Sequence, residues 1–168
     1  MKTARAFTLI EILVVVVLLG ILAAIVIPAI ASSSTSAKQS ALAVDLQLLR
    51  RFVLIYKCQH REVAPGYTDG DTAQTPTEQA FVEQATLASN AAGQTAQQGT
   101  PGFNRGPYIM KVPVNPMNGK SGVQMLGNGE DFPANGDDSH GWIYKAATSE
   151  IRADNAGTND SGKRYYDY

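Results

Sequence analysis

The sequence lacks two features that many exported or nucleic-acid-binding proteins carry. It has one cysteine, Cys58, among 168 residues, so the chain cannot close a disulfide within itself. It also has no run of basic residues, and 14 Lys and Arg stand against 15 Asp and Glu for a net charge of -1. A chain with this charge balance offers no electrostatic footprint for phosphates, so no nucleic-acid partner is expected.

Complete catalytic and metal-binding patterns are also missing. Residues 119–121 (GKS) match the end of a phosphate-binding loop, but Val114 occupies the place of the earlier glycine, so a turn is favoured. Cys58 and His60 lie two residues apart on a predicted helix and face different directions, which prevents a nucleophile and base pair. His140 is too distant in sequence to complete a zinc-ligand spacing. We therefore expect a protein that is not an enzyme.

A long apolar segment dominates the N-terminal part of the chain. From Phe7 to Ile30 only Thr8 and Glu11 are clearly polar. A helix of this length extends about 36 Å, enough to cross a hydrocarbon core of roughly 30 Å. Lys2 and Arg5 precede it, which predicts a cytoplasmic N-terminus and an exported remainder. A cleaved secretory signal is the alternative, but its apolar region would be shorter and free of charge.

Glu11 is out of place in this segment. An ionisable group near the centre of a membrane helix costs about 2.5–3.5 kcal/mol to insert, and less near an end. Either the carboxylate reaches the lipid headgroups one turn away, or it meets a positive charge that a neighbouring molecule supplies. The residues alone leave both interpretations open.

The stretch AFTLIEILVVVVLLGILAAIVIP, from Ala6 to Pro28, resembles the class III signal and N-terminal helix of type IV pilin-like proteins, which include pilins and type II secretion pseudopilins. Phe7 stands where the family has its first mature residue, Thr8 follows it, and Glu11 and Pro28 also fall at family positions. The resemblance implies that prepilin peptidase cuts between Ala6 and Phe7 and methylates the new amine. Ala6 stands where the family usually has glycine.

The resemblance also implies a role for Glu11. Cleavage creates a cationic amine on Phe7, and Glu11 of an adjacent subunit neutralises it when helices pack in a filament. Gly20 and the small residues at 23–24 allow close helix approach. Pro28 is expected to kink or loosen the helix near its outer end.

Beyond Pro28 no Gly or Pro occurs before His60, so one continuous helix is predicted. Its apolar residues recur at helical spacing and are taken as the face that packs on the head: Ala37, Ala41, Val44, Leu48, Phe52 and Ile55. The polar residues expected to face solvent are Lys38, Asp45, Arg50 and Lys57.

The remainder predicts a small head. Residues 75–78 (TPTE) form a capping box that opens a short helix through about Ala88. Residues 89–102 have little to bury and predict a mobile loop. Weak alternation predicts strands at Val123–Leu126 and Trp142–Lys145, the second forming a hairpin with Ile151–Ala153. The expected fold class is α+β and pilin-like, with a long helix packed on a small antiparallel sheet.

Three further segments resemble the major, G-type pseudopilins of type II secretion: LIYKCQHREVAPG at 54–66, GPYIMKVPVNPMNG at 106–119 and GWIYKAATSEIRAD at 141–154. The insertion at 66–101 departs from the compact family pattern. A type IV pilus pilin, acting in adhesion, motility or DNA uptake, is the nearest alternative. A membrane-anchored binding module or enzyme with an uncut helix is the alternative from a different class.

The segment NGEDFPANGDDSHGW gathers acidic side chains in a flexible context, which suits calcium. The G-type resemblance implies a calcium site in this region, with Asp131, Asp137 and Asp138 as candidate ligands. Asp154 and Asp160 offer a second, similar place. A solvated acidic turn is the alternative to any metal site.

The expected organisation is a leader at 1–6, a membrane and filament-core helix at 7–30, its continuation at 31–60, and a head at 61–168. The resemblance implies a single-pass inner-membrane protein with a periplasmic head. Its polymer would push substrates through an outer-membrane secretin, driven by a cytoplasmic ATPase. The implied partners are further copies of the chain, minor pseudopilins, prepilin peptidase, an inner-membrane platform protein and the secretin.

Overall fold

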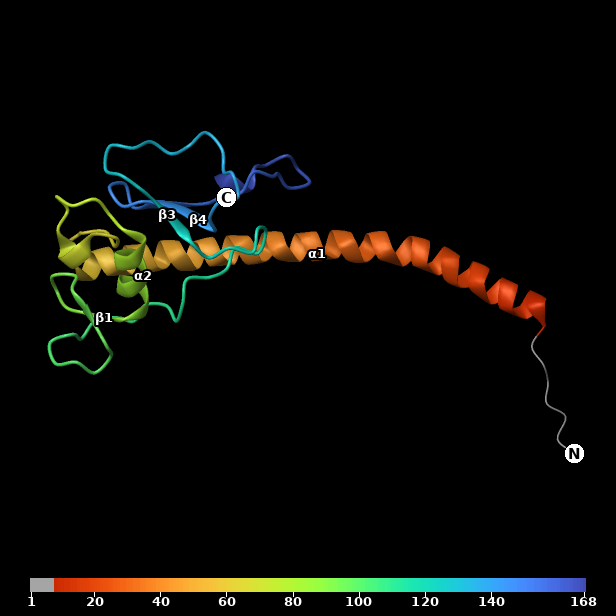
Figure 1. Cartoon of the computed structure of the whole chain (residues 1–168), viewed down its shortest axis with the longest axis horizontal. Coiled ribbons are helices and arrows are strands. Elements are labelled where there is room, and N and C mark those ends of the chain that lie inside the picture. The colour runs from red at the N-terminus through yellow and green to blue at the C-terminus, as the bar shows by residue number, and fades with distance from the viewer. Residues whose placement is uncertain (1–7) are drawn as a thin grey trace, which may run out of the picture. The chain divides into compact units, whose positions relative to one another are not determined.

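The computed structural model describes residues 8–168, without the side chains of residues 28, 29, 31 and 32. It divides into two compact units, of which the second, Gln39–Tyr168, is called the head unit below. The elements, coloured by position in Figure 1, are α1 (Leu9–Gln59), η1 (Thr68–Gly70), α2 (Glu78–Thr86), β1 (Ala88–Ser89), β2 (Thr95–Ala96), β3 (Val123–Leu126), β4 (Trp142–Lys145), β5 (Glu150–Ala153) and η2 (Tyr165–Asp167).

The prediction of one continuous helix is confirmed by α1, which has 51 residues. It passes Pro28 without interruption, so the proline does not end the helix, and the ring of Pro28 lies outside the described side chains. The helix ends after Gln59, where Arg61 and Glu62 adopt left-handed backbone angles with φ of 56° and 64°. The N–H of Glu62 then donates to the carbonyl of Lys57 at 3.0 Å, which closes the last turn.

The face of α1 that packs in the head is not the one predicted. Its buried residues are Leu42, Leu46, Leu49, Phe52, Val53 and Tyr56. Of the predicted stripe only Phe52 is buried, whereas Ala41, Val44, Leu48 and Ile55 are exposed. Both sides of this helix carry apolar residues at helical spacing. Periodicity therefore found an apolar stripe, but that stripe is exposed and not packed in the core.

A three-stranded sheet of order β3-β4-β5 packs against this helix. The β4–β5 hairpin is antiparallel as predicted, with Trp142 opposite Ala153. The pairing of β3 with β4 is parallel, with Val123 opposite Trp142, because the long connection between them crosses back to the same end of the sheet. Both faces of β4 are buried, which explains the weak alternation of its sequence. The α+β, pilin-like prediction is confirmed, but this sheet is mixed and not wholly antiparallel as expected.

The short helix α2 begins two residues later than expected. Thr77, not Thr75, caps it by accepting a hydrogen bond from the N–H of Ala80 at 3.2 Å. The carboxylate of Glu78 is not part of a capping box, since it accepts from the N–H of Val123 at 2.8 Å and so ties α2 to the start of β3. The helix ends at Thr86, and Ala88, which was expected to complete it, begins β1.

The segment predicted as a loop at 89–102 contains regular structure. The antiparallel strands β1 and β2 form a hairpin, and Ser89 also bridges to Arg105. The buried side-chain amide of Gln84 stabilises the turn of this hairpin. It donates to the carbonyl of Gly93 at 3.1 Å and also to that of Tyr67 at 2.8 Å. The prediction of a loop at 89–102 is therefore wrong for Ser89 and for Thr95–Ala96, where backbone pairing replaces the missing apolar burial.

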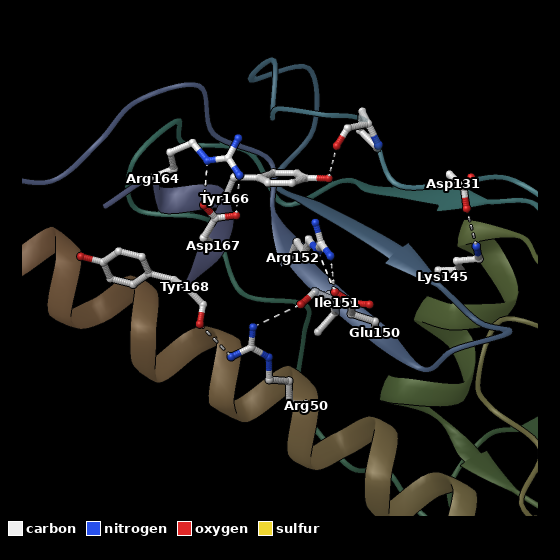
Figure 2. Close-up of polar contacts among 11 residues, drawn as sticks. Arg50, Asp131, Lys145, Glu150, Ile151, Arg152, Arg164, Tyr166, Asp167 and Tyr168 are labelled. Atoms are coloured by element: carbon white, nitrogen blue, oxygen red, sulfur yellow. Dashed lines mark hydrogen bonds and ion pairs between the residues drawn. The ribbon is translucent and has the colours of Figure 1, made fainter. Parts of the chain in front are cut away.

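The C-terminal residues return to α1. Figure 2 shows the guanidinium of Arg50 between two carbonyls, those of Ile151 on β5 and of Tyr168, at 3.4 and 3.2 Å. Tyr165 and Tyr166 in η2 are buried. These contacts close the head unit over the sheet, an arrangement that the polar sequence before these tyrosines did not predict.

Candidate functional site

The first candidate site is the apolar first part of α1. Leu9–Ile27 is 19 residues long and the one helical segment in the described residues that is long and apolar enough to cross a membrane. Its large apolar side chains are all exposed, with exposed fractions between 49% and 85%. Glu11 is its single charged residue. A surface of this kind needs lipid or other apolar chains around it.

The carboxylate of Glu11 is bound by the first turn of its own helix. Its Oε2 accepts hydrogen bonds from the N–H and the hydroxyl of Thr8, both at 2.9 Å. The Oγ of Thr8 in turn accepts from the N–H of Glu11 at 3.3 Å. This reciprocal arrangement is a capping box with the sequence TLIE. The sequence analysis did not predict it, because these residues lie in an apolar run. Within the described residues, no hydrogen bond is formed to Oε1.

The other N-terminal predictions have different outcomes. Ala6 and Phe7, the predicted cleavage residues, lie outside the described residues. Gly20 has no non-neighbouring atom within 4 Å of the position where a Cβ would stand, so its side of the helix is open to close approach. The roles proposed for Gly20 and Pro28 in assembly stay predictions.

A second exposed apolar surface lies on α1 within the head unit. Val44 and Leu54 are each 63% exposed, and Leu48 and Ile55 are each 39% exposed. We call these four residues the outer stripe. The outer stripe lies on the side of α1 opposite to the buried face, so it is available to another molecule.

The acidic loop, residues 130–140, is the third candidate. Asp131 is fully exposed, and its carboxylate lies 3.6 Å from the ammonium of Lys145, as Figure 2 shows. Asp137 accepts from the N–H of Ser139 at 2.9 Å. Hydrogen bonding by Ser139 holds the pKa of the Asp137 carboxyl below its usual value. Asp138 accepts from the Nδ2 of Asn155 at 2.8 Å.

A buried aspartate lies beneath this loop. Asp154, which is fully buried, accepts from the N–H of Asp137 at 2.8 Å and from the N–H of His140 at 2.7 Å. Its second oxygen also accepts from the hydroxyl of Ser139 at 3.1 Å. The sequence had placed Asp154 only in the weaker of two candidate sites. Its role could not be inferred because the loop that it supports lies more than ten residues earlier in the chain.

Comparison with known proteins identifies the family. A model of the prokaryotic N-terminal methylation motif matches residues 1–27. The type II secretion system core protein G of Klebsiella pneumoniae is 29% identical over 130 residues, which cover 77% of this chain and 79% of that protein. The protein of the same name from Pseudomonas aeruginosa is 33% identical over 115 residues, 68% of this chain and 69% of that protein. The chain belongs to the type II secretion system core protein G family. No solved structure is significantly similar to it.

The pseudopilin assignment agrees with the sequence-based prediction. For this family the question at the acidic loop is whether its carboxylates are arranged to bind calcium. In the described part of the chain, no group of three or more His, Cys, Asp or Glu side chains is arranged to hold a metal ion. Asp131 pairs with Lys145, whereas Asp137 and Asp138 bind protein donors. The three carboxylates thus contact protein groups in this structure, and calcium binding by them stays a prediction.

The other residues considered for chemistry in this pseudopilin are His60, Cys58 and the GKS sequence at 119–121. His60 is 2% exposed, its Nδ1 donates to the carbonyl of Tyr56 at 2.8 Å, and its Nε2 lies 3.0 Å from the hydroxyl oxygen of Ser89. The ring stacks on that of Tyr56, with centroids 3.8 Å apart. Cys58 is exposed on α1. Residues 116–118 form a turn just before the GKS sequence, as expected for a segment that is not a phosphate-binding loop.

Proposed function

We propose that this pseudopilin is the structural subunit of a type II secretion pseudopilus and is not an enzyme. Leu9–Ile27 holds it in the inner membrane, with the N-terminus cytoplasmic and the head unit periplasmic. Prepilin peptidase cuts between Ala6 and Phe7 and methylates Phe7. The mature chains polymerise, and the polymer pushes substrates through the secretin. The names of the relatives and the methylation motif support this proposal.

The observation that carries the proposal is Glu11 in the otherwise apolar, exposed segment Leu9–Ile27 of α1. The capping box satisfies one carboxylate oxygen within the subunit, and the other is available to the amine of a neighbouring Phe7. Pairing removes two charges that are each costly in lipid, so it favours helices packed side by side. The chain thus contains a reason to polymerise within the membrane.

The outer stripe supports the same function. Val44, Leu48, Leu54 and Ile55 are apolar side chains held on a rigid helix and open to contact. Such a stripe fits packing against other copies of the chain along the filament. The further partners proposed are minor pseudopilins, the inner-membrane platform protein and the secretin, with no nucleic acid.

Mass spectrometry of the N-terminus of the protein purified from membranes tests the proposal. The expected species begins with N-methylated Phe7, and Ala6→Gly, which restores the residue usual in the family, should be processed at least as completely. Mature protein that retains Met1 would contradict processing and favour a membrane-anchored module. Deletion of the gene should abolish secretion, and a restored copy of the gene should recover it. Loss of a type IV pilin would impair adhesion, motility or DNA uptake instead.

A further inference from the structure

We propose that the ammonium of Lys120 is the resident cation of the acidic loop and that it takes the place of a metal ion there. Nζ of Lys120 donates to the carbonyl of Asp138 at 2.8 Å and to that of Ser139 at 3.1 Å. These two carbonyl oxygens point to one positive charge, and backbone carbonyl oxygens are also ligands of calcium. A lysine ammonium is a compact charge with three donors and can satisfy both.

The chain delivers this ammonium from a turn that is itself fixed. The N–H of Asn115 donates to the carbonyl of Lys120 at 2.8 Å, and the N–H of Lys120 donates to Oδ1 of Asn118 at 3.0 Å. Gly141 lies so close that a Cβ at its position would clash with the carbonyl oxygen of Lys120. The backbone of Lys120 is therefore held beside the end of the acidic loop, which lowers the entropy lost when its side chain is ordered.

The same turn also binds the loop through amide side chains. Nδ2 of Asn118 donates to the carbonyls of His140 and Asp154, at 2.7 and 2.9 Å. Nδ2 of the buried Asn115 donates to the carbonyl of Gly141 at 2.8 Å and to Oδ1 of Asn155 at 2.7 Å. The acidic loop is thus joined to the lysine turn by several bonds, of which the ammonium contacts are the charged ones.

The carboxylates of the loop are directed toward protein donors and not toward a common point. Both oxygens of Asp154 are bonded by the loop backbone and by Ser139, and those of Asp138 by Asn155 and by the N–H of Ala156. A calcium ion needs six to eight oxygens around one centre, so it would have to displace Lys120 and also break these bonds. The chain itself supplies a positive charge at the carbonyls of Asp138 and Ser139. The loop therefore needs no added cation.

Thermal unfolding of the full chain in detergent micelles tests this inference, with calcium chloride or a calcium chelator present. Wild-type protein is expected to unfold at the same midpoint in both. Lys120→Met keeps most of the side chain but removes the charge, and should lower the midpoint by roughly 2–4 °C in the chelator. Lys120→Arg retains the charge, so its unfolding midpoint should fall by less than that of Lys120→Met. Lys111→Met is the matched control, because Lys111 is exposed and shows no polar contact among the described residues.

Two results would overturn the inference. One is a wild-type midpoint that rises on adding calcium, since the loop would then depend on a metal. The other is a Lys120→Met midpoint equal to that of Lys111→Met, since the ammonium would then contribute nothing to the loop. Neither result bears on whether the protein forms a pseudopilus, which the N-terminal processing and secretion measurements decide separately.

Discussion

Glu11 has two partners to satisfy, Thr8 within its own chain and the proposed amine of a neighbour. The capping box explains how a carboxylate is tolerated at the start of an apolar helix before assembly, because the N–H and hydroxyl of Thr8 compensate part of its charge. Pairing between subunits adds a full opposite charge. These two roles depend on different properties of the side chain, its shape and its ionisation, so substitutions can separate them.

Glu11→Gln is expected to insert normally but to fail in filament assembly. Glutamine can still accept from the N–H of Thr8 and so retains the capping box, but it carries no charge for the amine. Glu11→Ala loses both roles and should assemble no better. Thr8→Ala removes the cap, at a cost of about 0.5–2 kcal/mol of helix stability, yet keeps the charge and should still assemble.

Membrane fractionation and recovery of filaments from cells measure insertion and assembly separately. Filaments formed normally by Glu11→Gln would show that the cap, and not the charge pair, is what Glu11 supplies. Failure of Thr8→Ala together with success of Glu11→Gln would lead to the same conclusion.

His60 is expected to make the stability of the head unit depend on pH. Burial lowers the pKa of His60 from its usual value of 6.5, the hydrogen bond to the carbonyl of Tyr56 opposes this, and the charge of Arg105 adds to it. Because the folded pKa lies below the unfolded one, the unfolded state binds the proton more readily. The stabilisation is therefore complete above pH 6.5 and is lost as the pH falls through the folded pKa.

Denaturant unfolding at a series of pH values from neutral to acidic measures this dependence. The difference in unfolding free energy between wild type and His60→Gln should shrink as the pH falls. His140→Gln controls for the loss of a histidine elsewhere in the head unit. A constant difference between wild type and His60→Gln at all pH values would contradict a neutral, buried His60.

Among the elements, α1 is unusual in having apolar residues on both sides within the head unit. Its inner side builds the core through residues such as Leu49, whereas the outer stripe is open. Sequence periodicity detected an apolar stripe but could not decide which side the head would cover. That choice depends on where the sheet and α2 pack, which is set by contacts between residues far apart in the chain.

Val44→Glu is expected to leave the fold unchanged and to impair filament formation. Val44 is 63% exposed, so the unfolding free energy should change by no more than about 0.5 kcal/mol. Leu49→Ala, on the buried side of the same helix, should cost about 2–5 kcal/mol. Denaturant unfolding together with filament recovery tests both variants. Normal filaments from a stable Val44→Glu protein would exclude Val44 from the subunit contact.

Across the whole molecule, local signals were predictable and pairings between distant segments were not. The length of the apolar segment, its basic flank and the Phe7, Glu11 and Pro28 spacing are local, and they led to the family that the comparisons show. The cap of α2 was misplaced because Thr75 and Thr77 both fit the start of a helix. The parallel pairing of β3 and the contact of Lys120 with the acidic loop depend on segments separated by many residues.

The head unit is expected to fold without the apolar part of α1. Every residue of the two buried clusters lies within Gln39–Tyr168, so removing the preceding residues takes nothing from the core. A fragment that begins at Gln39 should be soluble and unfold cooperatively, as followed by circular dichroism and the fluorescence of the buried Trp142. Gradual unfolding, or solvent-exposed Trp142 fluorescence in the fragment, would show that the head depends on the residues before it.

The small size of the outer stripe makes its contacts depend strongly on the concentration of the chain. Four apolar side chains form a small contact, too weak to hold two chains together in dilute solution. Chains anchored by the proposed membrane helix share one plane and a restricted orientation, which raises their effective concentration. A weak contact then suffices for assembly in the membrane, while the same surface leaves a released head unit monomeric. Under the proposed function, the anchor would confine polymerisation to the membrane in addition to providing part of the polymer.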